Sequence, residues 1–159
     1  GDNGPTPEVD PDLLVGTPDE SLPWWPGWAL LAAVSVGGAL GAMARYGLGL
    51  VMVSQPLGWP WATFVANVVG SLLLGVLTTL AVDRFPDRAL VRPLLGVGVL
   101  GSFTTYSTVV VEIDTRLGQG RVAIAVAYGL GSVAAGVLAA AAGLELGRGL
   151  GRRRAGTMQ

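Results

Sequence analysis

Apolar residues group along the chain into four long runs, which are separated by short polar or charged connectors. The runs cover residues 28–53, 60–82, 93–111 and 122–144. Each has about the 20 residues that a helix needs to cross the hydrocarbon core of a bilayer. A soluble helical bundle would instead show a polar face at the helical period, and the fourth run offers only Tyr128 and Ser132. The pattern therefore predicts an all-α membrane protein with four transmembrane helices.

The two ends of the chain differ from these runs. Residues 1–26 are rich in Pro, Asp and Gly and have no apolar periodicity, so we expect a disordered, acidic N-terminal tail there. Residues 27–147 are predicted to form the four-helix transmembrane unit. Residues 148–159, with four arginines, are predicted to be a basic C-terminal tail.

Composition supports a membrane protein and argues against an enzyme. Of the 159 residues, 51% are hydrophobic and 13% are charged, which is about half the charged share of a soluble protein. The chain has no Cys and no His, which excludes disulfides, thiolate metal sites and a histidine general base. All ten basic residues are Arg, and they are not spread over a basic face as nucleic-acid binding would require. We therefore expect membrane lipid, and no nucleic acid, as a partner.

The distribution of arginine predicts an orientation. With four spans, both termini and the middle connector lie on one side, and that side carries seven arginines. The opposite side carries only Arg116 and Arg121, while Arg45 lies within the first run. The positive-inside rule then predicts a multi-pass protein of the cell membrane with both termini in the cytoplasm.

Polar side chains inside the apolar runs are candidate functional residues, because burying them in a membrane is costly. Arg45 could extend its guanidinium to the headgroups, or it could place a fixed positive charge near an anion path. Asn67 could join two helices by a hydrogen bond, or it could turn its amide donors toward an anion, which is the interpretation we favour.

The third run predicts a helix that is broken near its middle. Gly96, Gly98 and Gly101 precede residues 103–108, in which five of six side chains carry a hydroxyl group. Carbonyls freed by a break must be buried in protein or line a polar site, where they could coordinate a cation. The alternative is a continuous helix whose hydroxyls bond to the preceding turn. The apolar runs contain no carboxylate, and hydrogen-bond donors without acids suit a small, strongly hydrated anion.

Four motifs in chain order carry a family resemblance. They are GGALGAMARY at residues 37–46, TFVANVVGS at 63–71, GSFTTYST at 101–108, and Tyr128 with Ser132. Over residues 36–147 the chain resembles the Fluc-type (CrcB-like) fluoride channels. The resemblance implies an antiparallel dimer of four-helix subunits that lets fluoride leave the cell passively.

The resemblance also implies roles for individual residues. A structural Na⁺ at the dimer centre would be held by the backbone carbonyls of Gly101 and Thr104. Two phenylalanines of the family pattern are replaced here by Tyr106 and Val109, and valine has no positive ring edge to offer an anion. The implied fluoride pathway comprises Arg45, Asn67, Tyr106, Ser107, Thr108, Val109, Tyr128 and Ser132.

The replacement by Val109 and the uneven arginines together favour a heterodimer with a homologous chain over a homodimer. An antiparallel homodimer needs each chain to insert both ways, whereas seven arginines against two predict one fixed orientation. Two other function classes are weaker. A small proton-coupled multidrug exporter would need a carboxylate in its first span, and residues 28–82 contain none. A structural membrane protein without transport leaves Asn67 and residues 101–108 unexplained.

Overall fold

A computed structural model describes residues 27–52, 57–84 and 90–155. All regular structure in these ranges is helical, and four helical segments are long and apolar enough to cross a membrane. This confirms the predicted all-α architecture with four spans, while the tail predicted for residues 1–26 lies outside the described residues. The helices are α1 (Gly27–Val51), α2 (Trp61–Arg84), η2 (Pro93–Leu100), α3 (Gly101–Phe103), α4 (Ser107–Gly118) and α5 (Val122–Ala155).

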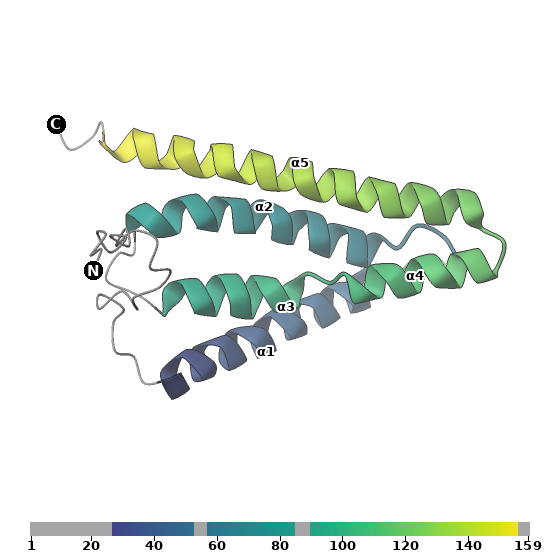
Figure 1. The fold of residues 1–159 in the computed structure, drawn as a ribbon, viewed down its shortest axis with the longest axis horizontal. Coiled ribbons are helices and arrows are strands. Elements are labelled where there is room, and N and C mark those ends of the chain that lie inside the picture. The colour runs from purple at the N-terminus through teal and green to yellow at the C-terminus, as the bar shows by residue number, and fades with distance from the viewer. Residues whose placement is uncertain (1–26, 53–56, 85–89, 156–159) are drawn as a thin grey trace, which may run out of the picture.

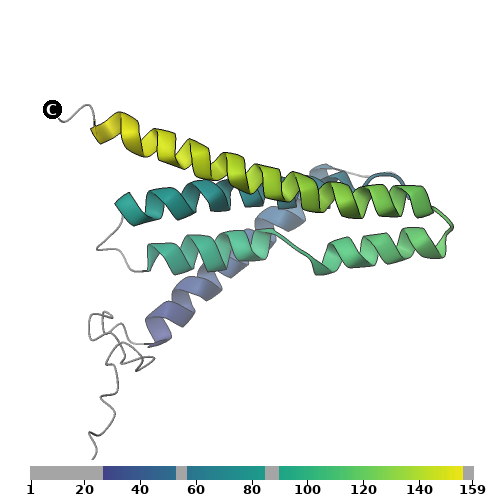
Figure 2. The ribbon, with the colours of Figure 1, turned by 45° about the horizontal axis from the view of Figure 1, so that its top comes forward.

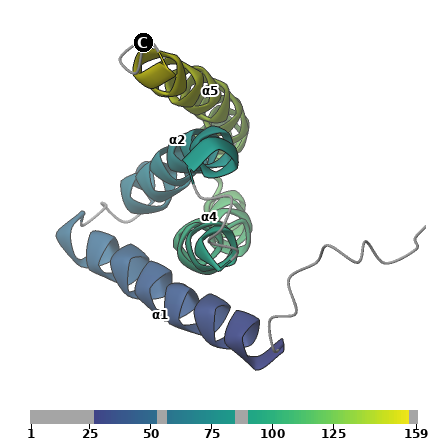
Figure 3. The same cartoon turned by 90° about the vertical axis from the view of Figure 1, so that its left-hand side faces the viewer.

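The helices form two packed pairs. Figure 1 shows α2 lying along α5, and the two run in the same direction. α1 packs against η2 and α3. Together with α4 these two helices make up the third membrane-spanning segment, Pro93–Gly118, and the end-on view in Figure 3 places this segment between α1 and α2. The third segment therefore contacts α1 and α2 through η2 and α3, and α5 through α4.

Glycine allows the helix backbones to approach closely in both pairs. A Cβ atom at Gly41 would overlap the carbonyl of Val99 in η2, and one at Gly143 would overlap the carbonyl of Leu72 in α2. Small residues at such positions are what packing between membrane helices requires, because backbone contact replaces side-chain interdigitation.

The third segment is interrupted, as the sequence predicts. η2 is a π-helix that leads into α3, and Thr104 then takes an extended conformation (φ −79°, ψ 158°) before α4 begins at Ser107. Figure 2 shows the short non-helical stretch between α3 and α4. α4 continues to Gly118, so this span is longer than the predicted run of 93–111 and includes Glu112.

Candidate functional site

Asn67 of α2 fixes the break in the third segment. Its Nδ2 donates to the carbonyl of Thr105 at 2.9 Å, and the Thr105 N–H donates to Asn67 Oδ1 at 2.8 Å. The side-chain amide thus satisfies both backbone groups of a residue that lies between two helices, where lipid could satisfy neither. Of the two alternatives for Asn67, the bond between two segments is present in the structure. A primary amide has two N–H donors, so the second one remains for another acceptor.

The same break removes the helical hydrogen-bond donors of two carbonyls. In a continuous helix Gly101 C=O would accept from Thr105 N–H, but that N–H is donated to Asn67. Thr104 C=O would accept from Thr108 N–H, which is donated to Thr105 Oγ1 at 3.2 Å instead. Gly101 and Thr104 are the two residues whose carbonyls are predicted to hold Na⁺, and both have oxygens without their helical partner.

Hydroxyl groups form a short chain at the start of α4. Thr105 Oγ1 donates to Thr108 Oγ1 at 3.0 Å and lies 3.3 Å from Ser107 Oγ. Because Thr108 Oγ1 accepts in this pair, its own hydrogen is available to a further acceptor. Ser107 is exposed on the surface of the chain.

A cavity of about 420 Å³ lies on one side of the break, and we call it the Ser132 cavity. Ser132 is 8% exposed, and its Oγ has no hydrogen-bond partner among the described residues. Buried Val109 also faces this cavity, whereas Tyr106 lies at its edge with 81% of its surface exposed. The polar part of the lining comes from Asn67, Ser71, Gly101, Thr104, Thr105, Tyr106 and Ser132.

A second cavity of about 300 Å³ lies on the other side of the break, and we call it the Arg45 cavity. Its polar lining comes from Arg45, Tyr46, Thr63, Thr105 and Thr108. Within the described residues the guanidinium of Arg45 makes no hydrogen bond or ion pair. Thr105 lines both cavities, so the residue that Asn67 holds forms the wall between them.

Glu112 is the polar residue of this region that the sequence reasoning missed. It lies half-buried in α4, where Oε1 accepts from Thr63 Oγ1 at 2.8 Å and Oε2 accepts from the hydroxyl of Tyr128 at 2.6 Å. The apolar runs of the sequence leave Glu112 outside, whereas the third span reaches Gly118 and includes it, so the inference that the spans hold no carboxylate was wrong. Three helices meet at this carboxylate.

Tyr128 takes part in this carboxylate cluster and lines neither of the two cavities. Its side chain is fully buried, and the one hydroxyl hydrogen it has is donated to Glu112. The sequence predicted that Tyr128 belongs to a fluoride pathway. In this arrangement its hydroxyl has no hydrogen left to donate to an anion.

Arg116 lies one helical turn after Glu112 and joins α4 to the connector before α2. Its guanidinium donates twice to the carbonyl of Gly58, at 3.0 and 2.7 Å, and once to the carbonyl of Glu112 at 2.6 Å. The ring of Trp59 packs edge-on against Tyr128 with centroids 5.5 Å apart. The connector before α2 is thereby attached to α4 and α5. The bonds from Arg116 to Gly58 and the contact between Trp59 and Tyr128 join segments more than 50 residues apart, and no local motif in the sequence indicates them.

Comparisons with known proteins agree with these features. Residues 32–144 match the protein family described as "CrcB-like protein, Camphor Resistance (CrcB)". Fluoride-specific ion channel FluC 1 of Mycolicibacterium paratuberculosis is 47% identical over 109 residues, which cover 69% of this chain and 83% of the relative. Fluoride-specific ion channel FluC 2 of Nocardia farcinica is 47% identical over 124 residues, covering 78% and 86%.

A third relative has a lower identity. Fluoride-specific ion channel FluC of Chloroflexus aurantiacus is 41% identical over 123 residues, which cover 76% of this chain and 97% of the relative. The family match, residues 32–144, contains the second and third membrane-spanning segments in full and most of the first and the fourth. By its family match and by these relatives, which are ion channels and not enzymes, the chain belongs to the CrcB-like, Fluc-type family.

Proposed function

We propose that this chain is a subunit of a fluoride-specific ion channel that lets fluoride leave the cell passively. The observation that carries the proposal is the hydrogen-bonded pair of Asn67 and Thr105, because it holds in place a non-helical residue that lines two cavities, each of which has polar side chains in its lining. The named function of the relatives, fluoride-specific ion channel, supports the same conclusion.

The donors around the break suit an anion that gives up a tightly held hydration shell. Selective passage requires that protein groups replace water along the path. The second N–H of Asn67 and the hydroxyl of Ser132 would serve an ion in the Ser132 cavity. The guanidinium of Arg45 and the free hydrogen of the Thr108 hydroxyl would serve it in the Arg45 cavity. Ser107, next to Thr105, would lie at the edge of this path.

Whether Tyr128 can contact an anion in the proposed pathway depends on its hydrogen bond to Glu112. Tyr128 and Thr63 both donate to the carboxylate, which holds their hydroxyl groups at the end of the Arg45 cavity that Thr63 lines. An anion next to this cluster would compete with the carboxylate for hydroxyl hydrogens. Tyr128 would therefore affect transport only if the bond to Glu112 opens.

A structural Na⁺ at a dimer centre is the second part of the proposal. The carbonyl oxygens of Gly101 and Thr104 would hold it, and they suit a hard cation because they lack their helical donors and are neutral oxygen ligands. Groups of three or more His, Cys, Asp or Glu side chains that could hold a metal are not found among the described residues. Bound Na⁺ would supply positive charge that fixes the broken segment against a second subunit.

The remaining part of the proposal concerns assembly. Tyr106 projects from the break with 81% of its surface exposed, and a second subunit packed antiparallel over the break would cover its ring. Val109, buried beside the Ser132 cavity, offers no ring edge to an anion. With the uneven arginines, this favours a homologous partner chain that supplies the missing aromatic ring, and both termini in the cytoplasm.

The deciding experiment is fluoride efflux from liposomes. The chain is purified alone, reconstituted into liposomes loaded with potassium fluoride, and followed with a fluoride-selective electrode beside a chloride-loaded control. Rapid fluoride efflux without chloride efflux is expected for a channel that works by itself, and it would exclude the obligate heterodimer.

The absence of efflux would need a second step. Co-expression with a homologous chain that restores fluoride-selective efflux would support the heterodimer. Failure of the chain alone and with each homologue would overturn the proposed function. Reporter tags at both ends, read from each side of the membrane, test the orientation: equal signal from both sides would contradict a fixed one.

A further inference from the structure

One end of the helical bundle carries most of its positive charge. At this end α2 stops at Arg84, η2 begins after the exposed Arg92, and α5 ends in a helical turn with three arginines (Figure 1). Among the described residues this end has six arginines against Asp83 and Glu145. At the opposite end two arginines are balanced by two acids, and one of these arginines, Arg116, is buried on the carbonyl of Gly58.

α5 carries this charge out of the membrane without interruption. The helix has 34 residues, which is about 51 Å at 1.5 Å per residue, whereas the hydrocarbon core is about 30 Å thick. About 20 residues from Val122 suffice to cross it. The last apolar stretch ends at Leu144, and the remaining helix carries Glu145, Arg148 and the run 152–154. These positions are therefore at the level of the headgroups and just beyond.

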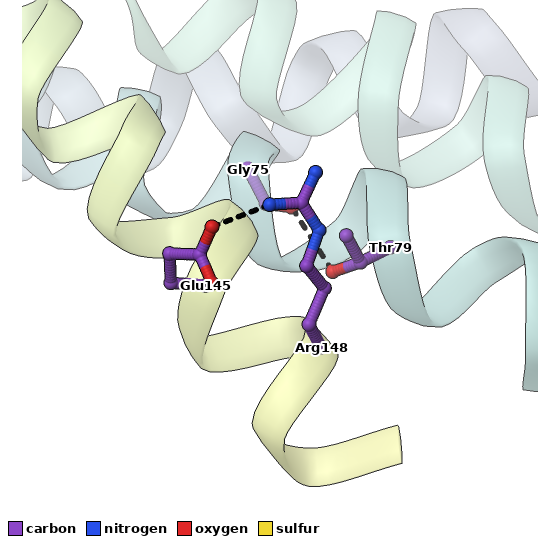
Figure 4. Close-up of polar contacts among 4 residues, drawn as sticks. All are labelled: Gly75, Thr79, Glu145 and Arg148. Carbon is purple, nitrogen blue, oxygen red and sulfur yellow. Dashed lines mark hydrogen bonds and ion pairs between the residues drawn. The ribbon is translucent and has the colours of Figure 1, made fainter. Parts of the chain in front are cut away.

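Glycines hold α5 against α2 up to this level. A Cβ atom at Gly147 would overlap the side chain of Thr79, so the two helices are still in close contact one residue before Arg148. Figure 4 shows Arg148 paired with Glu145 next to Thr79, which bonds to the carbonyl of Gly75 in its own helix. The charge of Arg148 is thus offset by Glu145.

The three following arginines have no such acid near them in α5. Consecutive positions on an α-helix are about 100° apart, so residues 152–154 occupy three different directions around the helix axis. A single face would suit a partner on one side. Positions spread over about 200° of the helix circumference suit a surface that surrounds the helix, which is the case for the headgroup layer where a transmembrane helix emerges.

We propose that this basic end binds the headgroups of anionic phospholipids. Arginine pairs its guanidinium with phosphate oxygens through two parallel hydrogen bonds. A basic residue beside an anionic membrane surface gains about 1 kcal/mol, within roughly a Debye length of that surface. Because the arginines directly follow a membrane span, lipid headgroups always lie within a Debye length of them. An acidic protein or RNA would instead have to diffuse to this end of the bundle. The inference is independent of the ion that the protein conducts.

Spin-labelled lipids test this directly. The full chain is reconstituted into phosphatidylcholine bilayers, and electron paramagnetic resonance measures the motionally restricted fraction of spin-labelled phosphatidylglycerol and phosphatidylcholine. We expect phosphatidylglycerol to be enriched at the protein about fivefold at low salt, the factor that corresponds to about 1 kcal/mol. The enrichment should fall toward one in R152Q/R153Q/R154Q and at high salt. It should be unchanged in the control Arg121→Gln, which alters an exposed arginine at the opposite end.

Two results would overturn the proposal. One is an equal enrichment of phosphatidylglycerol in the wild type and in R152Q/R153Q/R154Q. The other is an enrichment that arises only after deletion of residues 1–20, which contain six acids and no base, because the chain's own acidic segment would then be the occupant of the basic end. Gel filtration and circular dichroism of each variant confirm that the fold is retained.

Discussion

The side-chain amide of Asn67 makes two hydrogen bonds to the backbone of Thr105, one to its carbonyl and one from its N–H. Through this pair α2 determines where the third segment stops being helical. The pair also explains why the Gly101 carbonyl loses its helical donor, which is donated to Asn67. The donor of the Thr104 carbonyl goes instead to the hydroxyl of Thr105, the residue that Asn67 holds. A single side chain from a neighbouring helix thus holds together the wall of both cavities.

Asn67→Asp tests this relationship. Aspartate can still accept from Thr105 N–H, but it places a second acceptor opposite the Thr105 carbonyl, which loses its donor. Leaving a buried carbonyl unsatisfied costs about 1–3 kcal/mol. We expect lower stability by about this amount in thermal unfolding in detergent, and loss of fluoride efflux. Thr78→Ala is the control, because Thr78 is a hydroxyl residue of the same helix that bonds only to Leu74 in the turn before it; a decline of the same size there would contradict a specific role for Asn67.

Ser132→Ala separates function from stability. The Ser132 hydroxyl is buried and has no partner among the described residues, so its removal should leave stability unchanged or raise it by up to about 1 kcal/mol. If the hydroxyl donates to fluoride, efflux should fall several-fold in the same variant. Ser35→Ala, which alters an exposed serine of α1, should change neither quantity. Lower stability with unchanged efflux would show that Ser132 is only a packing residue.

Arg45→Gln tests the positive charge in the second cavity. A positive charge about 6 Å from the anion, in a medium of effective dielectric constant about 40, stabilises the anion by roughly 1.4 kcal/mol. We therefore expect fluoride efflux to fall about tenfold at low ionic strength when this charge is removed. The effect should shrink as salt is added. Stability should not change, because the guanidinium makes no bond to the described part of the chain. A matched change at Arg121 should have little effect, and equal losses in both variants would indicate a general effect of net charge.

The sequence predicts the parts of this protein that depend on local pattern. Continuous apolar runs predict the four spans, because a bilayer requires about 20 apolar residues in each helix. The dense glycines and hydroxyls around Gly101 and Thr105 predict the break, since glycine loses the most backbone entropy in a helix and short hydroxyl side chains compete for backbone hydrogen bonds. Both features follow from residues that are neighbours in the chain.

Contacts between helices could not be predicted in the same way. Glu112 looks like a connector residue because it follows an apolar run and precedes Asp114 and Arg116. Its burial depends on Thr63 and Tyr128, which come from two other helices. For Asn67 the sequence favoured an anion over a bond between two helices, and it could not indicate the bond to Thr105, because that bond depends on where Thr105 lies.

Gly143→Ala tests the packing of α5 on α2. A Cβ atom there would overlap the Leu72 carbonyl, so the helices would have to separate and lose backbone contact along the pair. We expect a loss of stability of about 1–3 kcal/mol, the usual cost of overpacking, and reduced efflux. Gly49→Ala is the matched control, because a Cβ atom at Gly49 meets nothing within 4 Å. Equal thermal midpoints for the two variants would contradict this account of the helix pair.

Glu112→Gln tests the carboxylate cluster. The carboxylate accepts from Thr63 with one oxygen and from Tyr128 with the other, whereas glutamine keeps only one oxygen and places an NH₂ group opposite the second hydroxyl. Because glutamine is neutral, a charge-assisted bond worth about 1.5–3 kcal/mol is lost even where its remaining oxygen still accepts from a hydroxyl. We expect a lower thermal midpoint in detergent for this variant and an unchanged one for Asp114→Asn, which alters an exposed acid of the same helix. If both variants unfold at the wild-type midpoint, the cluster does not hold α2, α4 and α5 together, and the attachment must come from Arg116 and Trp59.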